Sequence, residues 1–134
     1  MKIEELSIGD FLLFTDGDCA VRVEELYNDA QLLISDGDSI SEPVHLTHLH
    51  PIPLTPEILE KNGWSEFSDY HNSWKLDIAS DKRVWMFKNS HDWTFQVMNW
   101  GLGYNHSVAK AYIKHIHELQ HALRLAGIEK EIGL

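Results

Sequence analysis

Residues 74–97 read WKLDIASDKRVWMFKNSHDWTFQV, and this stretch decides the fold that the sequence predicts. Apolar and polar residues alternate along it, which is the period of a strand with one buried face. The alternation is interrupted by Ser80–Lys82 and Asn89–Asp92, whose polar residues are typical of turns. The stretch therefore predicts a three-stranded antiparallel meander. Such a meander needs a cover over its apolar face.

The segment Ser107–Ala126 is expected to supply this cover as one C-terminal helix, which Gly127 closes as a cap. Its apolar residues recur at the spacing of one helical face. They are Val108, Tyr112, Ile116, Leu119, Leu123 and Ala126.

Residues 8–53 show short apolar runs separated by turn signals, the last run being Val44–Leu49. Four or five short strands over about 45 residues are what a small SH3-like barrel needs. Thr55 and Pro56 then begin a short helix, because threonine caps a helix and proline suits its first turn.

The predicted fold class is therefore α+β. Residues 1–53 are expected to form a small SH3-like β-barrel unit. Residues 54–134 are expected to form a short linking helix and a meander packed on the C-terminal helix, and the two halves join in one compact domain or stay separate.

The chain of 134 residues carries 21 acidic and 11 basic residues, a formal net charge of −10. Such a charge is repelled by phosphate backbones at long range, which argues against non-specific nucleic-acid binding. The ordinary interpretation of the charge is solubility. The sharper interpretation is an acidic surface that meets a basic partner or mimics DNA.

The single cysteine, Cys19, excludes an intrachain disulfide, and we expect it to be a small apolar filler in a strand. The segment Met1–Leu6 lacks the apolar core of a signal peptide, and no run of about 18 apolar residues is present. We therefore place the protein in a cytoplasm, without a membrane partner.

His117–His121 spells His-Glu-x-x-His, the helical signature of zinc hydrolases. In that signature the two histidines bind zinc and the glutamate is the general base. On the expected helix, however, His117 and His121 lie opposite the apolar stripe, among basic side chains. We therefore expect no catalytic residue, metal or cofactor. A zinc hydrolase, with His117 and His121 as ligands and Glu118 as its base, is kept as an alternative.

The polar side of the expected helix, which carries His117 and Gln120, is where we expect a partner to bind. Trp64, Trp74 and Trp100 lie near the ends of expected elements, so we expect them to be exposed and to take part in binding.

Trp85 and Phe87 share one strand face, and Trp93 and Phe95 share another. Cross-strand pairing is expected to bring the two sets together in the core. If some of these rings stay exposed instead, they would stack a sugar or an unpaired base.

Three segments together resemble a known group of proteins. Pro51–Trp64 resembles the "I-P-L-T-x-E-I-L-x-x-x-G-F" segment of a group of small uncharacterised proteins from Bacteroides-type gut bacteria and their phages or mobile elements. Ile113–Leu123 resembles the group's "I-K-Y-V-H-x-L-Q-N" helix, and Ile8–Leu12 is similar to its "I-G-N-x-V" opening. The order and spacing match over nearly the whole chain. Asparagine usually stands in the group where this chain has His121, which counts against zinc binding.

The sequence thus leads us to expect a non-enzymatic binding or accessory module, encoded by a phage or mobile element, that acts through protein contacts. A zinc-dependent hydrolase is one alternative. Specific nucleic-acid binding through the barrel half is the other.

Overall fold

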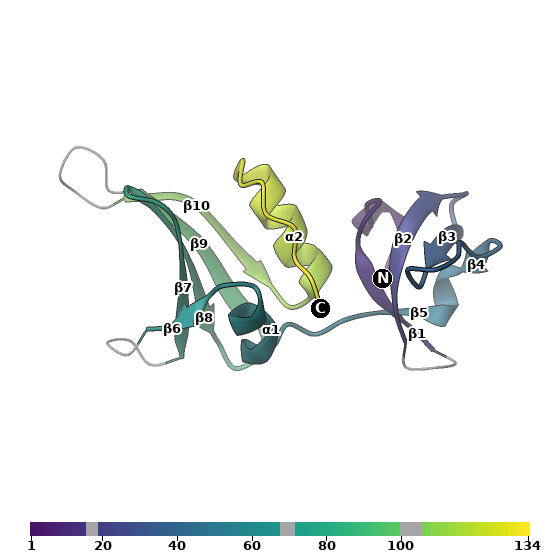
Figure 1. The fold of residues 1–134 in the computed structure, drawn as a ribbon, viewed down its shortest axis with the longest axis horizontal. Helices are drawn as coiled ribbons and strands as arrows, with labels where there is room; N and C mark the ends of the chain where they lie inside the picture. Colours follow the sequence, from purple (N-terminus) through teal and green to yellow (C-terminus); the bar gives the residue numbers. More distant parts are fainter. Residues whose placement is uncertain (16–18, 68–71, 100–105) are drawn as a thin grey trace. The chain divides into compact units, whose positions relative to one another are not determined.

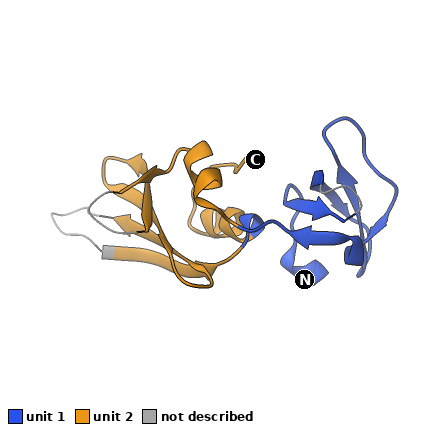
Figure 2. Ribbon diagram, turned by 90° about the horizontal axis from the view of Figure 1, so that it is seen from below, with its two compact units in different colours: residues 1–53, 115–117 blue, residues 54–114, 118–134 orange. Residues whose placement is uncertain are grey.

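The computed structural model describes residues 1–15, 19–67, 72–99 and 106–134. The chain divides into two compact units. Unit 1 consists of Met1–Pro53 with His115–His117, and unit 2 consists of Leu54–Lys114 with Glu118–Leu134 (Figure 2).

Unit 1 is an antiparallel five-stranded sheet with the strand order β4-β3-β2-β1-β5. Its core is aliphatic and includes Leu12, Val23 and Leu32, which are fully buried. The elements of unit 1 are η1 (Ile3–Glu5), β1 (Phe11–Phe14), β2 (Cys19–Leu26), β3 (Gln31–Ser35), β4 (Val44–His45), η2 (Leu46–His48) and β5 (Leu49–Pro51).

Two expectations for this half are wrong. Val44–Leu49 is not one strand, because a 3-10 turn, η2, separates β4 from β5; the His45 side chain starts that turn by accepting the backbone N–H of Thr47. Cys19 does begin a strand, but it is exposed and is not an apolar filler. It pairs with Phe14 at the end of the β1–β2 ladder, beyond the buried part of the strand.

Unit 2 is also built on an antiparallel five-stranded sheet, with the strand order β10-β9-β8-β7-β6 (Figure 1). The expected meander is present as β7, β8 and β9, and one strand is added at each edge. The elements are α1 (Pro56–Lys61), β6 (Ser65–Glu66), β7 (Ser73–Ala79), β8 (Lys82–Lys88), β9 (Trp93–Asn99), β10 (His106–Ile113) and α2 (Ile116–Leu125). Two antiparallel sheets with two α-helices among the described residues make an α+β protein.

The expected helix Ser107–Ala126 is wrong over its first half. That half is β10, which pairs with β9, and α2 begins only at Ile116. Val108 and Tyr112, expected in the helical stripe, lie on β10 and are 51% and 64% exposed. The pairing of β10 with β9 satisfies the backbone of this segment and overrides its helical pattern.

The inner face of the unit 2 sheet holds a large part of that unit's core. The register places Trp74, Met86 and Phe95 in one row across β7, β8 and β9, and all three are buried. Trp74 also contacts the ring of Trp93, with 5.4 Å between centroids. The helix α2 crosses this face (Figure 1) and buries Leu119 against it.

The start of α1 and the end of α2 are as the local sequence predicts. The Thr55 hydroxyl accepts the backbone N–H of Ile58 at the start of α1. Gly127 follows α2 with a φ of 75°, and the N–H of Ile128 donates to the carbonyl of Leu123, as in a Schellman cap. Neither of these helices has the length and apolar character needed to cross a membrane.

Candidate binding face

The His-Glu-x-x-His motif lies on α2, but its first histidine does not face solvent. His117 is 4% exposed, and its ring stacks on that of His115 with centroids 5.7 Å apart. The expected solvated side of the helix is therefore wrong at His117, whose side chain is buried and lies beside the ring of His115.

The other members of the motif do not complete a zinc site within the described residues. Glu118 Oε1 accepts the backbone N–H of Lys114 at 3.2 Å, so this carboxylate is hydrogen-bonded to the backbone that leads into α2. His121 is half-buried one turn beyond His117. In the described ranges, no three His, Cys, Asp or Glu side chains are grouped so that they could hold a metal ion.

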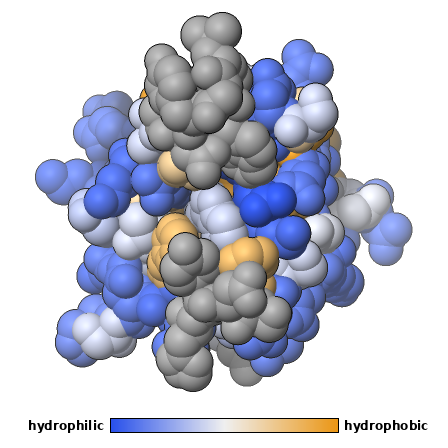
Figure 3. Space-filling view, turned by 90° about the vertical axis from the view of Figure 1, so that its left-hand side faces the viewer, coloured by the Kyte–Doolittle hydropathy of each residue, from blue (hydrophilic) through white to orange (hydrophobic). Residues whose placement is uncertain are grey.

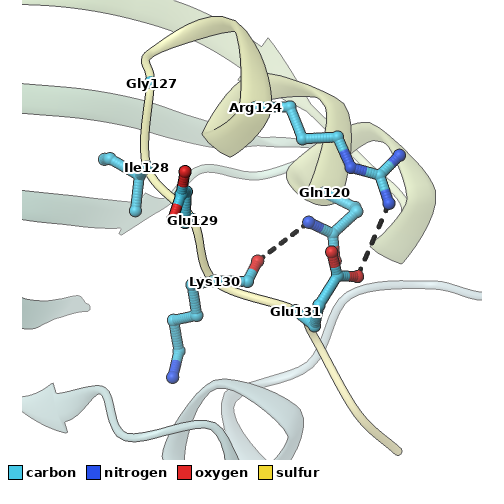
Figure 4. Close-up of a pocket in the computed structure, with 7 residues that line it drawn as sticks. All are labelled: Gln120, Arg124, Gly127, Ile128, Glu129, Lys130 and Glu131. Atoms are coloured by element: carbon cyan, nitrogen blue, oxygen red, sulfur yellow. Dashed lines mark hydrogen bonds and ion pairs between the residues drawn. The ribbon is translucent and has the colours of Figure 1, made fainter.

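Gln120 is buried as well, and its role is structural. Its side-chain Nε2 donates to the carbonyl of Lys130 at 2.8 Å, and its Oε1 accepts the buried N–H of Ile132 at 2.8 Å. Figure 4 shows this amide pointing at the backbone of the segment that follows α2. The expectation that Gln120 lies on an open polar surface is wrong, because Ile128–Leu134 folds back over that side of the helix.

A second amide side chain holds the same segment. Asn62, at the end of α1, accepts the N–H of Gly133 and donates to its carbonyl, both at 2.8 Å. The pocket in Figure 4, between α2 and the turn after it, has a volume of about 490 Å³ and includes Gln120 in its lining. The polar groups of Gln120 are already used by the backbone, so this side chain does not serve as a ligand-binding group of the pocket.

The tryptophans expected to be exposed are core residues where they are described. Trp64 is 2% exposed and Trp74 is 5% exposed. The indole N–H of Trp74 donates to Glu60 Oε1 at 3.2 Å, so the polar edge of this buried ring has a hydrogen-bond partner. Trp100 lies outside the described residues.

The side of the unit 2 sheet that faces away from α2 carries a different set of aromatic residues. We call this side the outer face. Its central row crosses all five strands. That row consists of Ser65, Lys75, Trp85, Gln96 and Lys110. A neighbouring row consists of Ser73, Phe87, Thr94 and Tyr112.

The register also corrects the expected pairing of the aromatic residues. Trp85 is opposite Gln96 and Phe87 is opposite Thr94, so these two rings lie on the outer face and do not meet Trp93 in the core. Both are half-buried. Figure 3 looks from the left-hand side of Figure 1 and shows hydrophobic and pale residues gathered among hydrophilic ones beside the grey atoms.

The rings on the outer face contact one another. Trp85 and Phe87 stack with 5.6 Å between centroids and an angle of 18° between ring planes. Phe67 meets Trp85 edge to face at 4.9 Å. Such arrangements are favourable for aromatic pairs, so the three rings form one ordered platform.

Each of three cations on this face lies over an aromatic ring. Lys75 lies 5.4 Å from the centroid of Phe67, and Arg83 lies 5.3 Å from that of Trp85. Lys110 lies 5.6 Å from the centroid of Tyr112, the most exposed ring of the group.

One carboxylate accompanies these cations. Asp77 forms an ion pair with Arg83 at 2.5 Å and lies 4.0 Å from Lys75. On the described strands, the outer face therefore carries the positive charges of Lys75, Arg83 and Lys110 and the negative charge of Asp77.

The acidity of the chain is concentrated outside unit 2. Residues 1–53 hold two basic and eleven acidic residues, a net charge of −9, and residues 54–134 hold nine basic and ten acidic residues, a net charge of −1. Unit 2 is therefore nearly neutral although the whole chain is acidic, and its outer face carries basic and aromatic residues. The signal that could have located this face was the alternation of Lys75 and Asp77 with Trp74 and Leu76 in β7, since it marks a solvated side of the meander.

No protein-family model matches the chain, and neither a curated protein nor a solved structure matches it significantly.

Proposed function

We propose that this protein is a non-enzymatic binding module and that the outer face of unit 2 contacts its ligand. One observation carries the proposal: the solvent side of this sheet holds a platform of three aromatic rings, and a cation lies over two of them, Phe67 and Trp85. An antiparallel sheet covered on one side usually has polar residues on the other. A group of aromatic rings on the solvent side of a sheet is typical of a surface that binds a ligand or a partner.

The chemistry of α2 supports a binding role over a hydrolytic one. Glu118 accepts a backbone N–H of the segment that leads into the helix, and Gln120 anchors the segment after it. These residues have structural functions, and a zinc hydrolase would need Glu118 free to act on water.

We also infer that unit 1 is SH3-like. Its strand β1 pairs with both β2 and β5, and a 3-10 turn precedes β5. The order of the five strands supports this inference, since closing β4 towards β5 would make a small barrel. The net charge of −9 in residues 1–53 disfavours the alternative that this half binds nucleic acid.

The proposal is tested with three defined probes and one double variant. The probes are an oligothymidylate of about 12 nucleotides, poly-L-glutamate as a stand-in for an acidic protein, and a neutral oligosaccharide. Lys110→Gln with Tyr112→Ala removes two exposed groups of the outer face.

Saturable binding to one probe, weakened at least tenfold by the double variant, supports the proposal. The matched control is Lys61→Gln with Tyr27→Ala, which changes an exposed lysine of α1 and an exposed tyrosine of unit 1. No binding to any probe, or equal weakening by both double variants, contradicts it.

A further inference from the structure

We propose that the outer face of unit 2 binds unpaired, single-stranded nucleic acid. The inference rests on the proposed function, because it names the ligand class of the same face. Bases would add to the aromatic platform, and phosphates would meet the lysines and the arginine beside it.

The first argument is the pairing of rings with cations. Proteins that bind single strands combine aromatic side chains, on which bases stack, with positive charges along the backbone. Here Arg83 lies over Trp85 and Lys110 over Tyr112. A nucleotide that stacks on either ring would carry its phosphate close to a charge already in place.

The second argument is the position of the aromatic rings and of one amide side chain across the sheet. Phe87 and Tyr112 occupy the same row two strands apart, which corresponds to about 10 Å. The central row adds the Gln96 amide between Trp85 and Lys110. This amide is suited to base edges because it both donates and accepts hydrogen bonds.

The third argument separates nucleic acid from an acidic protein. An acidic peptide would use the cations alone, but a flat base would also stack on an exposed ring, and Tyr112 is 64% exposed beside Lys110. The charge of −10 does not oppose this ligand locally, since residues 54–134 have a net charge of only −1. Phosphate repulsion would come mainly from the −9 of residues 1–53, which weakens binding at low salt without removing the site.

The test uses the full chain and fluorescein-labelled oligothymidylate and oligouridylate of about 12 nucleotides, followed by anisotropy. Saturable binding is expected to both or to one of them, and the two arms show whether DNA or RNA is preferred. With three phosphates neutralised, the logarithm of the binding constant should fall with the logarithm of the salt concentration with a slope of about −2.

Two single variants locate the binding. Tyr112→Ala should weaken it about tenfold, as expected for losing one stacked base, while Tyr27→Ala leaves it unchanged. Lys110→Gln should make the salt slope shallower by about 0.7, the contribution of one phosphate contact, while Lys61→Gln does not. The exposed positions of these side chains allow each variant to fold, which circular dichroism checks.

Three outcomes overturn the inference in distinguishable ways. If poly-L-glutamate binds in a Tyr112-dependent manner and the oligonucleotides do not, the ligand class is wrong and the binding module stands. If oligonucleotides bind equally to wild type and to Tyr112→Ala and Lys110→Gln, the site is elsewhere. If no probe binds, both the inference and the proposed function fail.

Discussion

Replacing Gln120 by alanine should detach the segment Ile128–Leu134 from α2 and destabilise unit 2. The change removes two hydrogen bonds, to the carbonyl of Lys130 and from the buried N–H of Ile132. A buried donor left without a partner costs about 1–3 kcal/mol, and an ordinary lost hydrogen bond about 1 kcal/mol. We therefore expect the free energy of unfolding to fall by about 2–4 kcal/mol.

Urea unfolding followed by tryptophan fluorescence measures this change. All five tryptophans of the chain come after residue 53 in the sequence, so the signal reports on unit 2. Arg124→Ala is the matched control: Arg124 lies one turn further along α2 and contacts Glu131 of the same segment at 3.5 Å. Both side chains of that pair are substantially exposed, so its loss should cost less than about 1 kcal/mol.

Hydrogen exchange provides a second, local measurement for the same variant. The amide of Ile132 should exchange much faster in Gln120→Ala than in the wild type, because its acceptor is gone. An unfolding free energy no lower in Gln120→Ala than in Arg124→Ala, together with a still-protected Ile132 amide, would refute the reasoning.

Three further outcomes follow from individual contacts. Asn62→Ala should speed amide exchange at Gly133, which loses both hydrogen bonds to that side chain; unchanged exchange speaks against the anchor. The pKa of Asp36 is held below its usual value by backbone N–H groups of its own turn, so the stabilisation of the turn is complete above the ordinary pKa and lost as the pH falls through the lowered one; a carboxyl carbon NMR titration with a midpoint at or above the ordinary value contradicts this. Trp74→Phe should lower the unfolding free energy by about 1 kcal/mol or more through the lost bond to Glu60, and Glu60→Gln, which keeps the acceptor, should cost less.

The meander could be predicted because its signal is local. Trp93, Phe95 and Val97 alternate with polar residues, and the structure buries all three. The strand β10 could not be predicted in the same way. Val108 and Tyr112 precede Ile116 at intervals of four residues, which continues the pattern of α2 back into the strand. Only the pairing with β9, the preceding strand, decides the conformation there.

The candidate face was missed for a related reason. In β8, Val84 and Met86 are apolar on one side and Trp85 and Phe87 are aromatic on the other, so alternation does not show which side is buried. The register with β9 decides it, by placing Met86 opposite Phe95.

For α2 the error is the reverse: polar residues that were expected on an open surface are buried. Gln120 is buried because the backbone of a later segment supplies its hydrogen-bond partners, and residue type alone does not reveal such a partner.

The most direct test of the outer face is an NMR titration of the ¹⁵N-labelled chain with unlabelled oligothymidylate. Saturating chemical-shift changes should appear at the Trp85 indole and at the backbone amides of Lys75, Gln96 and Lys110, which form one row of the face. The indole of Trp74, buried on the inner side, and the core amides of unit 1 should change little. Changes concentrated in unit 1, or none at any oligonucleotide concentration, would contradict the assignment of this face as the binding surface for single strands.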